Sequence, residues 1–217
     1  MQQIHLEQGE HRHLVIHHIA ADAAQWSIEQ EADSVLTIHL ICLDRQPDTV
    51  GDVRLNIRQI GEHAETFIYG LGIIRGKQQV SVHTHVEHCV PGGTSTQLLK
   101  FAVGDEARAS FLGELIVAPH AQHTQAMQTN RNILLSPAAT MHTQPQLEIY
   151  ADDVKCSHGA TTGQLDESAL FYMMQRGLNT DTARQLLLAA FFHDVLLTLH
   201  EPELVERLQR KIAARLA

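Results

Sequence analysis

Short runs of alternating apolar and polar residues extend from about residue 12 to about residue 160. In the run 35–43, every second residue from Leu36 to Cys42 is apolar, and in 52–60 polar residues separate Val53, Leu55 and Ile57. Because successive side chains of a strand point to opposite faces, this period of two predicts strands with one buried face. Similar runs occupy residues 66–74, 79–86, 96–103, 109–117 and 146–151.

Turn signals separate these runs at intervals of roughly 10 to 15 residues, as in all-β folds. The predicted turns are Gly51-Asp52, Gly61-Glu62, Gly76-Lys77 and Gly104-Asp105. Such spacing is typical of a β-sandwich, a β-barrel or a β-solenoid. The sequence has no strict hexapeptide repeat, so the pattern alone leaves these three architectures open.

Helical periodicity replaces the strand pattern after about residue 165. Asp166 can cap a helix that stops at Gly177, and Thr180 or Asp181 can start a longer helix. Pro202 is acceptable at the first position of a final helix. The apolar stripes predicted to pack on the strands are Ala183, Leu186, Leu187, Ala190 and Phe191, then Leu204, Val205, Leu208 and Ile212. Phe191 and Phe192 are adjacent, which suggests a second adhesive side on the longer helix.

The composition fits a folded protein with one main core and a small subdomain. The chain has 217 residues, of which 44% are hydrophobic and 19% charged, and its formal net charge is -9. This negative charge disfavours nucleic acid and anionic membranes as partners. The N-terminus lacks a signal-peptide pattern, and no segment approaches the roughly 20 apolar residues that span a bilayer. We therefore expect a cytoplasmic protein that does not contact a membrane.

The segment HTHVEHC contains His83, His85, His88 and Cys89. It is superficially similar to the HxHxDH run of metallohydrolases, so these four residues form a candidate metal site of a small metalloenzyme. The alternative is a solvated strand. His83 and His85 share the face opposite Val80, Val82 and Val86, and would then face solvent or a partner.

A second candidate site is the segment KCSHGATTG, which carries Cys156 and His158. At positions i and i+2 of an extended chain their side chains point the same way, about 7 Å apart at the backbone, so thiolate and imidazole could bind one iron. An iron–sulfur cluster takes about four protein ligands, so another subunit would have to supply the rest. The alternatives are a structural cysteine beside a turn histidine, or a nucleophile whose thiol pKa is lowered by His158.

Motifs of common enzymes are absent from the sequence. It has no GxSxG elbow, no GxxxxGK phosphate loop and no GxGxxG after a strand. The cysteines Cys42, Cys89 and Cys156 are too few and too far apart for a disulfide framework. These absences give no support to a nucleophilic enzyme or to a nucleotide site.

Residues 121–177 resemble the conserved C-terminal region of the SufB/SufD family, most closely its SufD branch. The similarity is carried by NRNILLS at Asn130 to Ser136, by Pro145 with Leu147-Glu148-Ile149, and by ADDVKCSHGATTG at 151–163. It extends more loosely over at least residues 80–217. The resemblance implies a right-handed parallel β-helix, here over residues 1–160, followed by a C-terminal α-helical subdomain over 161–217.

The resemblance also implies a scaffold in the SUF system of iron–sulfur cluster assembly, which is not an enzyme and binds no nucleotide itself. Members of the family dimerise through their β-helices, so the partner would be a SufB-like subunit or a second copy of this chain. They bind the SufC-type ABC ATPase through the C-terminal region, here expected between about residues 150 and 200. Cys156 and His158 then become candidate ligands of a transient cluster or iron at the subunit interface, with Cys42 and Cys89 as structural residues.

The chain departs from the family pattern in three places. It begins almost at once with strands and lacks the N-terminal helical region of typical members. Gln175 replaces the usual serine before Arg-Gly, and the segment CVPGGTS is looser than the common version. A divergent paralogue, or a minimal protein like an ancestor of SufB and SufD that forms homodimers, would account for these differences.

Overall fold

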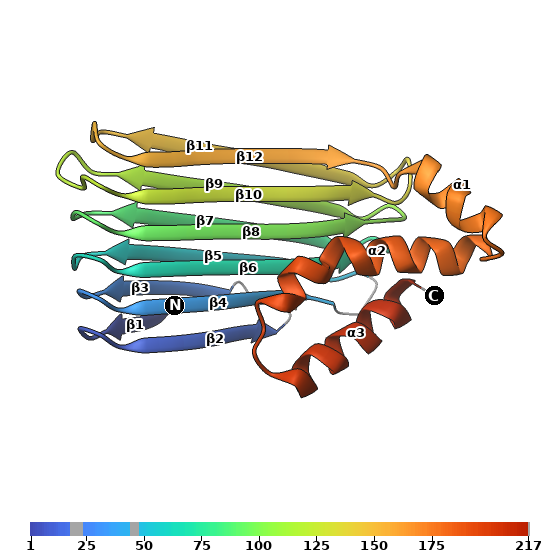
Figure 1. Cartoon of the computed structure of the whole chain (residues 1–217), viewed down its shortest axis with the longest axis horizontal. Helices are drawn as coiled ribbons and strands as arrows, with labels where there is room; N and C mark the ends of the chain where they lie inside the picture. The colour runs from blue at the N-terminus through green and yellow to red at the C-terminus, as the bar shows by residue number, and fades with distance from the viewer. Residues whose placement is uncertain (18–23, 44–47, 217) are drawn as a thin grey trace.

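The computed structural model describes residues 1–17, 24–43 and 48–216. In these ranges, strands occupy the first three quarters of the chain and helices the last quarter (Figure 1). The strands are β1 (Gln2–Leu6), β2 (His11–His17), β3 (Ala24–Gln30), β4 (Val35–Cys42), β5 (Val50–Gln59), β6 (Glu65–Ile74), β7 (Gln79–His88), β8 (Thr94–Val103), β9 (Arg108–Val117), β10 (Gln125–Leu134), β11 (Thr140–Ile149) and β12 (Lys155–Gly163). The helices are α1 (Glu167–Gln175), α2 (Thr180–Leu197) and α3 (Pro202–Leu216).

The strands form two parallel sheets that face each other. One has the order β1-β3-β5-β7-β9-β11 and the other β12-β10-β8-β6-β4-β2. Consecutive strands of the chain therefore lie in alternate sheets, and each pair of strands forms one coil. Register partners in the second sheet, such as Thr66, Ser95, Ala126 and Cys156, lie 29 to 31 residues apart. This arrangement confirms the predicted β-solenoid and excludes the sandwich and the barrel.

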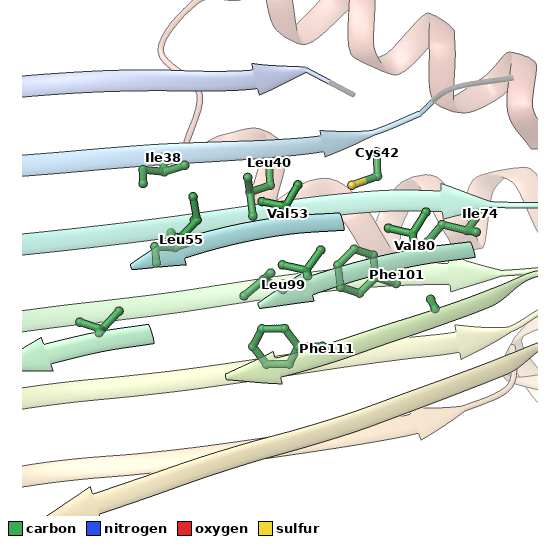
Figure 2. Close-up of a cluster of buried hydrophobic side chains, with 14 of the residues drawn as sticks. Ile38, Leu40, Cys42, Val53, Leu55, Ile74, Val80, Leu99, Phe101 and Phe111 are labelled. Atoms are coloured by element: carbon green, nitrogen blue, oxygen red, sulfur yellow. The ribbon is translucent and has the colours of Figure 1, made fainter. Parts of the chain in front are cut away.

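Apolar side chains from both sheets fill the space between them. Figure 2 shows Ile38 and Leu40 of β4 and Val53 and Leu55 of β5 pointing into this layer. All four are at most 1% exposed. Their burial confirms the period-two interpretation of the sequence, because the inward-facing residues are those that the alternation selects.

Helices α2 and α3 cover part of the outer face of the β12-to-β2 sheet. Leu188, Phe192 and Val195 of α2 pack on residues such as Leu71 and Ile73 of β6. Lys100 of β8 is buried beneath α2 and donates from Nζ to Asp194 Oδ2 at 2.6 Å and to the Phe191 carbonyl at 2.8 Å. A buried ammonium is costly without partners, so this pair fixes where α2 lies on the sheet.

The helix ends largely follow their sequence signals. Asp166 caps α1 by accepting hydrogen bonds from the backbone of Ser168 and Ala169. The helix ends before Gly177, whose φ of 91° lies in the region that favours glycine. The cap of α2 is Asn179, one residue before the predicted start.

The predicted apolar stripe of α2 is wrong for two of its five members, while Ala183 is buried and Leu187 and Phe191 are partly buried. Leu186 is 47% exposed and Ala190 is also exposed, whereas Leu188 and Phe192 are buried. The segment 186–192 is apolar on all sides, so the outer face of the sheet, rather than the pattern, decides which side is buried. Phe191 is half-buried against Lys100, so it does not supply the expected second adhesive side. The stripe of α3 is confirmed at Leu204, Leu208 and Ile212, which are buried, while Val205 is partly buried.

Two strand features also differ from the sequence prediction. Gly51 and Asp52 lie inside β5 instead of forming a turn. The predicted runs did not include β1, β3, β10 or β12, and β12 continues to Gly163, so strands give way to helices a few residues after 160. Within the described ranges, no helix combines the length and the apolar character that crossing a bilayer requires.

Candidate functional site

The solenoid ends in two strands with a free edge each. Among the described residues, β11 pairs only with β9, and β12 pairs only with β10. The outermost side chains on this end are correspondingly accessible, and β12 is exposed over almost its whole length. We call the pair β11 and β12 the open end of the solenoid.

Cys156 and His158 lie on β12, on the face directed into the solenoid. Their register partners on β10 are Ala126 and Gln128, which are buried in the interior, and partners in a parallel sheet present their side chains to the same side. Cys156 is half-buried against the cluster that contains Ala126, whereas His158 is exposed. The structure therefore keeps the two predicted ligands on one face, at the open end.

Burial raises the pKa of the Cys156 thiol, partly offset by a backbone hydrogen bond from Ala126. His158 does not contribute to this shift. The electrostatics therefore give no support to an activated nucleophile, since an imidazole that activated the thiol would lower its pKa. Binding to a metal ion is the remaining way in which this thiol would be deprotonated near neutral pH.

A column of polar side chains lies beneath His158. Below it, Gln128 of β10 and Gln97 of β8 are each 1% exposed and follow one another in register, whereas the next two positions down are Ile68 and Ile38. Thr84 Oγ1 donates to Gln97 Oε1 at 2.7 Å from the opposite sheet. The column was not foreseen, because a single buried glutamine inside a strand gives no period signal.

The neighbouring column is also polar towards the open end. Asn130 and Asn132 of β10 are buried, and Asn132 Nδ2 donates to Asn130 Oδ1 at 2.6 Å and to the Thr161 carbonyl of β12 at 3.2 Å. Thr143 of β11 donates to Asn130 Oδ1 at 2.9 Å. These asparagines of the NRNILLS motif therefore tie both strands of the open end to the coil below.

The structure does not bring His83, His85, His88 and Cys89 together. His83 and His85 point outward from β7, as expected, and pair with Asp52 at 3.7 Å and Glu114 at 3.0 Å. The other two are placed differently.

His88 is fully buried on the inner face of β7, where its Nε2 lies 2.8 Å from Ser95 Oγ. Burial lowers the pKa of His88 to about 4. Cys89 follows the strand, 3.9 Å from Arg58 Nη2, and burial raises the pKa of its thiol. The alternation that predicted solvent-facing His83 and His85 thus also separates them from His88.

In the described part of the chain, no group of three or more His, Cys, Asp or Glu side chains could hold a metal ion. Cys156 and His158 offer one sulfur and one imidazole, a donor set that suits iron, and they leave half of a four-ligand set to be filled from outside. The free edges of β11 and β12 leave room for a second polypeptide at this point. Cys42 is buried, and burial raises the pKa of its thiol to about 12, in keeping with the structural role expected for it. All three cysteines are free, as predicted.

Comparison with known proteins gives one consistent family. A family model described as "SUF system FeS cluster assembly, SufBD core domain" matches residues 4–191, well upstream of residue 80. The chain is 40% identical over 161 residues to an iron–sulfur cluster assembly SufBD family protein of Synechocystis, covering 74% of this chain and 36% of the relative.

Two further relatives agree with this match. Identity is 39% over 156 residues to the iron–sulfur cluster assembly protein SufD of Escherichia coli, covering 72% of this chain and 37% of the relative. It is 33% over 188 residues to the chloroplastic protein ABCI7 of Arabidopsis thaliana, covering 86% and 39%. The chain spans less than two fifths of the length of these three relatives. The extent of the family match, together with the solenoid that carries the CSHGAT motif at its open end, shows that the chain belongs to the SufBD family of the SUF iron–sulfur cluster assembly system.

Proposed function

We propose that this chain is a non-catalytic scaffold subunit of the cytoplasmic SUF machinery, which holds iron or a cluster in transit at a subunit interface. The observation that carries the proposal is the position of Cys156 and His158 at the open end, on one face of a strand with a free edge. A cluster bound there would be cargo, with its other ligands from the second subunit. The three free cysteines agree with a reducing compartment.

The second subunit would pair with the open end, either a SufB-like chain or another copy of this one. A free strand edge carries unpaired N–H and C=O groups that readily bind another strand. The Lys155 N–H donates to the Thr124 carbonyl below it, and backbone groups alternate sides along a strand, so the Ala160 N–H points towards the free edge. Ala160→Pro would remove that donor without breaking the pairing with β10.

The SufC-type ATPase would bind to the helices of this chain. The ATPase would perform the ATP hydrolysis, for which this chain has no sequence motif. Phe171 and Tyr172 of α1 are 63% and 59% exposed. An apolar groove of about 580 Å³ separates α2 from α3, with Leu186 and Ala190 among its lining residues. Exposed aromatic side chains and apolar grooves are both typical of protein-binding surfaces, and these two features fall largely within the expected range 150–200.

The test is anaerobic co-expression with the SUF ATPase and SufB-like subunit of the same genome, followed by size-exclusion chromatography with iron, sulfide and zinc assays. We expect one complex that contains iron, from which His158→Ala removes the iron and keeps the subunits. Ala160→Pro should release the β-helix partner, with Ala160→Val as its matched control. Phe171→Asp should release the ATPase, while Val50→Asp, which alters an equally exposed apolar residue on β5, should not.

The outcomes separate the parts of the proposal. An isolated chain that ignores the ATPase and carries stoichiometric zinc would contradict the scaffold function. A complex that forms normally but keeps its iron in His158→Ala would leave the chain as a structural subunit without a ligand role. Release of the ATPase by Val50→Asp as well would show that the helices are not its specific contact.

A further inference from the structure

Gln128 has an unusual environment for a buried amide. Among the described residues, neither its Nε2 nor its Oε1 has a hydrogen-bond partner, although the side chain is 1% exposed. Leaving a buried amide without partners costs free energy, and most buried polar side chains avoid it. A functional role for Gln128 would explain why this position of the column is a glutamine, whereas the corresponding positions of lower coils are isoleucine.

Space for this amide is provided by Gly113 on the opposite sheet. A Cβ atom at Gly113 would lie 2.3 Å from Gln128 Nε2 and 2.6 Å from Phe111 Cζ, so any other residue would displace the amide. The glycine therefore makes room for a polar side chain that has no partner in its own layer. Above Gln128 the column ends at His158 of β12, a strand that pairs with no further strand among the described residues.

His158 is the register partner of Gln128 on β12. Neighbouring strands lie about 4.8 Å apart, and both residues have inward-facing register positions, so the two side chains are adjacent members of one column. A histidine that binds a metal through one ring nitrogen usually donates its other N–H to an oxygen, which fixes the tautomer and the ring orientation. An amide oxygen without a partner beneath the ring suits that role.

We propose that Gln128 is a positioning residue for His158: its Oε1 accepts the N–H of the inward ring nitrogen and leaves the outward nitrogen free to bind the ligand. The proposal rests on the function proposed above, in which His158 is a ligand. It makes Gln128, which sequence motifs do not single out, part of the site. Gly113 contributes to the same arrangement, because it leaves the space that the amide occupies.

The experiment is nitrogen-15 NMR of the full chain with labelled histidine, at about pH 8, where an ordinary imidazole is neutral. His158→Ala assigns the signal. In the wild type we expect one dominant tautomer of His158, and in Gln128→Leu a mixture of both. Gln128→Glu keeps an acceptor and should restore the single tautomer, which a merely structural role would not do. The matched control Gln97→Leu removes a buried amide one strand further down and should leave the His158 signal unchanged.

Gln128→Leu should fold, because replacing an amide without partners by an apolar side chain of similar size is close to neutral. The wild-type spectrum is decisive even without it, since a tautomer mixture there would overturn the proposal. An identical single tautomer in wild type and Gln128→Leu would also overturn it. A second readout is iron retained by the assembled complex, which should fall by about 10-fold or more in Gln128→Leu.

The two proposals fail in different ways. If His158→Ala removes iron while Gln128→Leu leaves the tautomer unchanged, the ligand function stands and the positioning role is wrong. If Gln128 sets the tautomer while His158→Ala keeps the iron, the positioning role stands and the ligand function is wrong.

Discussion

The lower and upper coils of the solenoid have the same backbone and different interiors. In one inward-facing column, the lower positions are Ile38 and Ile68, and the upper positions are Gln97, Gln128 and His158. Strand β4 is buried along one whole face, whereas β12 is exposed over nearly all of its length. Along this column, the repeating backbone thus combines an apolar half, which provides stability, with a polar half, which ends in a strand edge and two potential ligands.

This difference has a physical reason. Apolar burial contributes about 25 cal/mol per Å² and needs no particular partner, so the lower coils gain stability from any well-packed set of aliphatic residues. Polar side chains in the upper coils gain little net stability, but they hold specific orientations through hydrogen bonds. A site that has to present a thiol and an imidazole to another subunit needs the second property more than the first.

The largest expected effect comes from the apolar half. Ile68→Ala should lower the free energy of unfolding by about 2 to 5 kcal/mol, because it removes buried methyl groups and leaves a cavity between close-packed sheets. Ile68 is fully buried, whereas His158 at the top of the same column is exposed. His158→Ala should therefore change stability by less than about 0.5 kcal/mol. Urea denaturation of both variants checks the contrast, and equal losses would contradict the division into two halves.

The sequence predicted the strands with an apolar inner face better than those with a polar inner face. The apolar alternation predicted β4 to β9 to within about two residues at each end, because burial of one face is what the pattern records, but it gave no run for β1 or β3. Strand β10 was not predicted, because its inward residues Gln128, Asn130 and Asn132 are polar and give its sequence the pattern of a solvated segment. The solenoid itself came from family resemblance, since a coil of about 30 residues with irregular corners gives no hexapeptide signal.

The candidate site could likewise be predicted from the sequence only in part. Resemblance identified Cys156 and His158, and alternation placed them on one face. Gln128 and Gly113 could not be found in this way, because their role depends on which strands become neighbours. Register between β10 and β12 is a tertiary property, set by packing of the whole coil.

The middle of the solenoid offers an intermediate effect, which depends on pH. His88 has a pKa lowered to about 4 by burial, against about 6.5 in the unfolded chain, so the unfolded state binds more protons between these values. Stability is complete above pH 6.5 and is lost as the pH falls towards 4. From pH 7 to pH 5 this histidine alone should cost about 2 kcal/mol of unfolding free energy.

His39, whose pKa is also lowered to about 4 by burial and by the charges of His13 and His200, acts in the same direction. His88→Gln should therefore reduce the loss measured by urea denaturation at the two pH values without abolishing it. His39→Gln is the matched comparison on the outer face of the sheet. A loss unchanged by His88→Gln would show that His88 does not remain neutral in the folded chain.

The smallest effect should appear in the polar half, at Thr84. Its hydroxyl donates to Gln97 Oε1 at 2.7 Å, and both residues are about 1% exposed. Thr84→Val keeps the shape and removes the donor, so we expect a loss of about 1 kcal/mol in urea denaturation, the net value of one hydrogen bond with some penalty for the acceptor left behind. Combining it with Gln97→Leu should cost less than the sum of the two changes, because the acceptor is then gone as well. Strict additivity would mean that the two side chains act independently and that the upper column is not a connected polar unit.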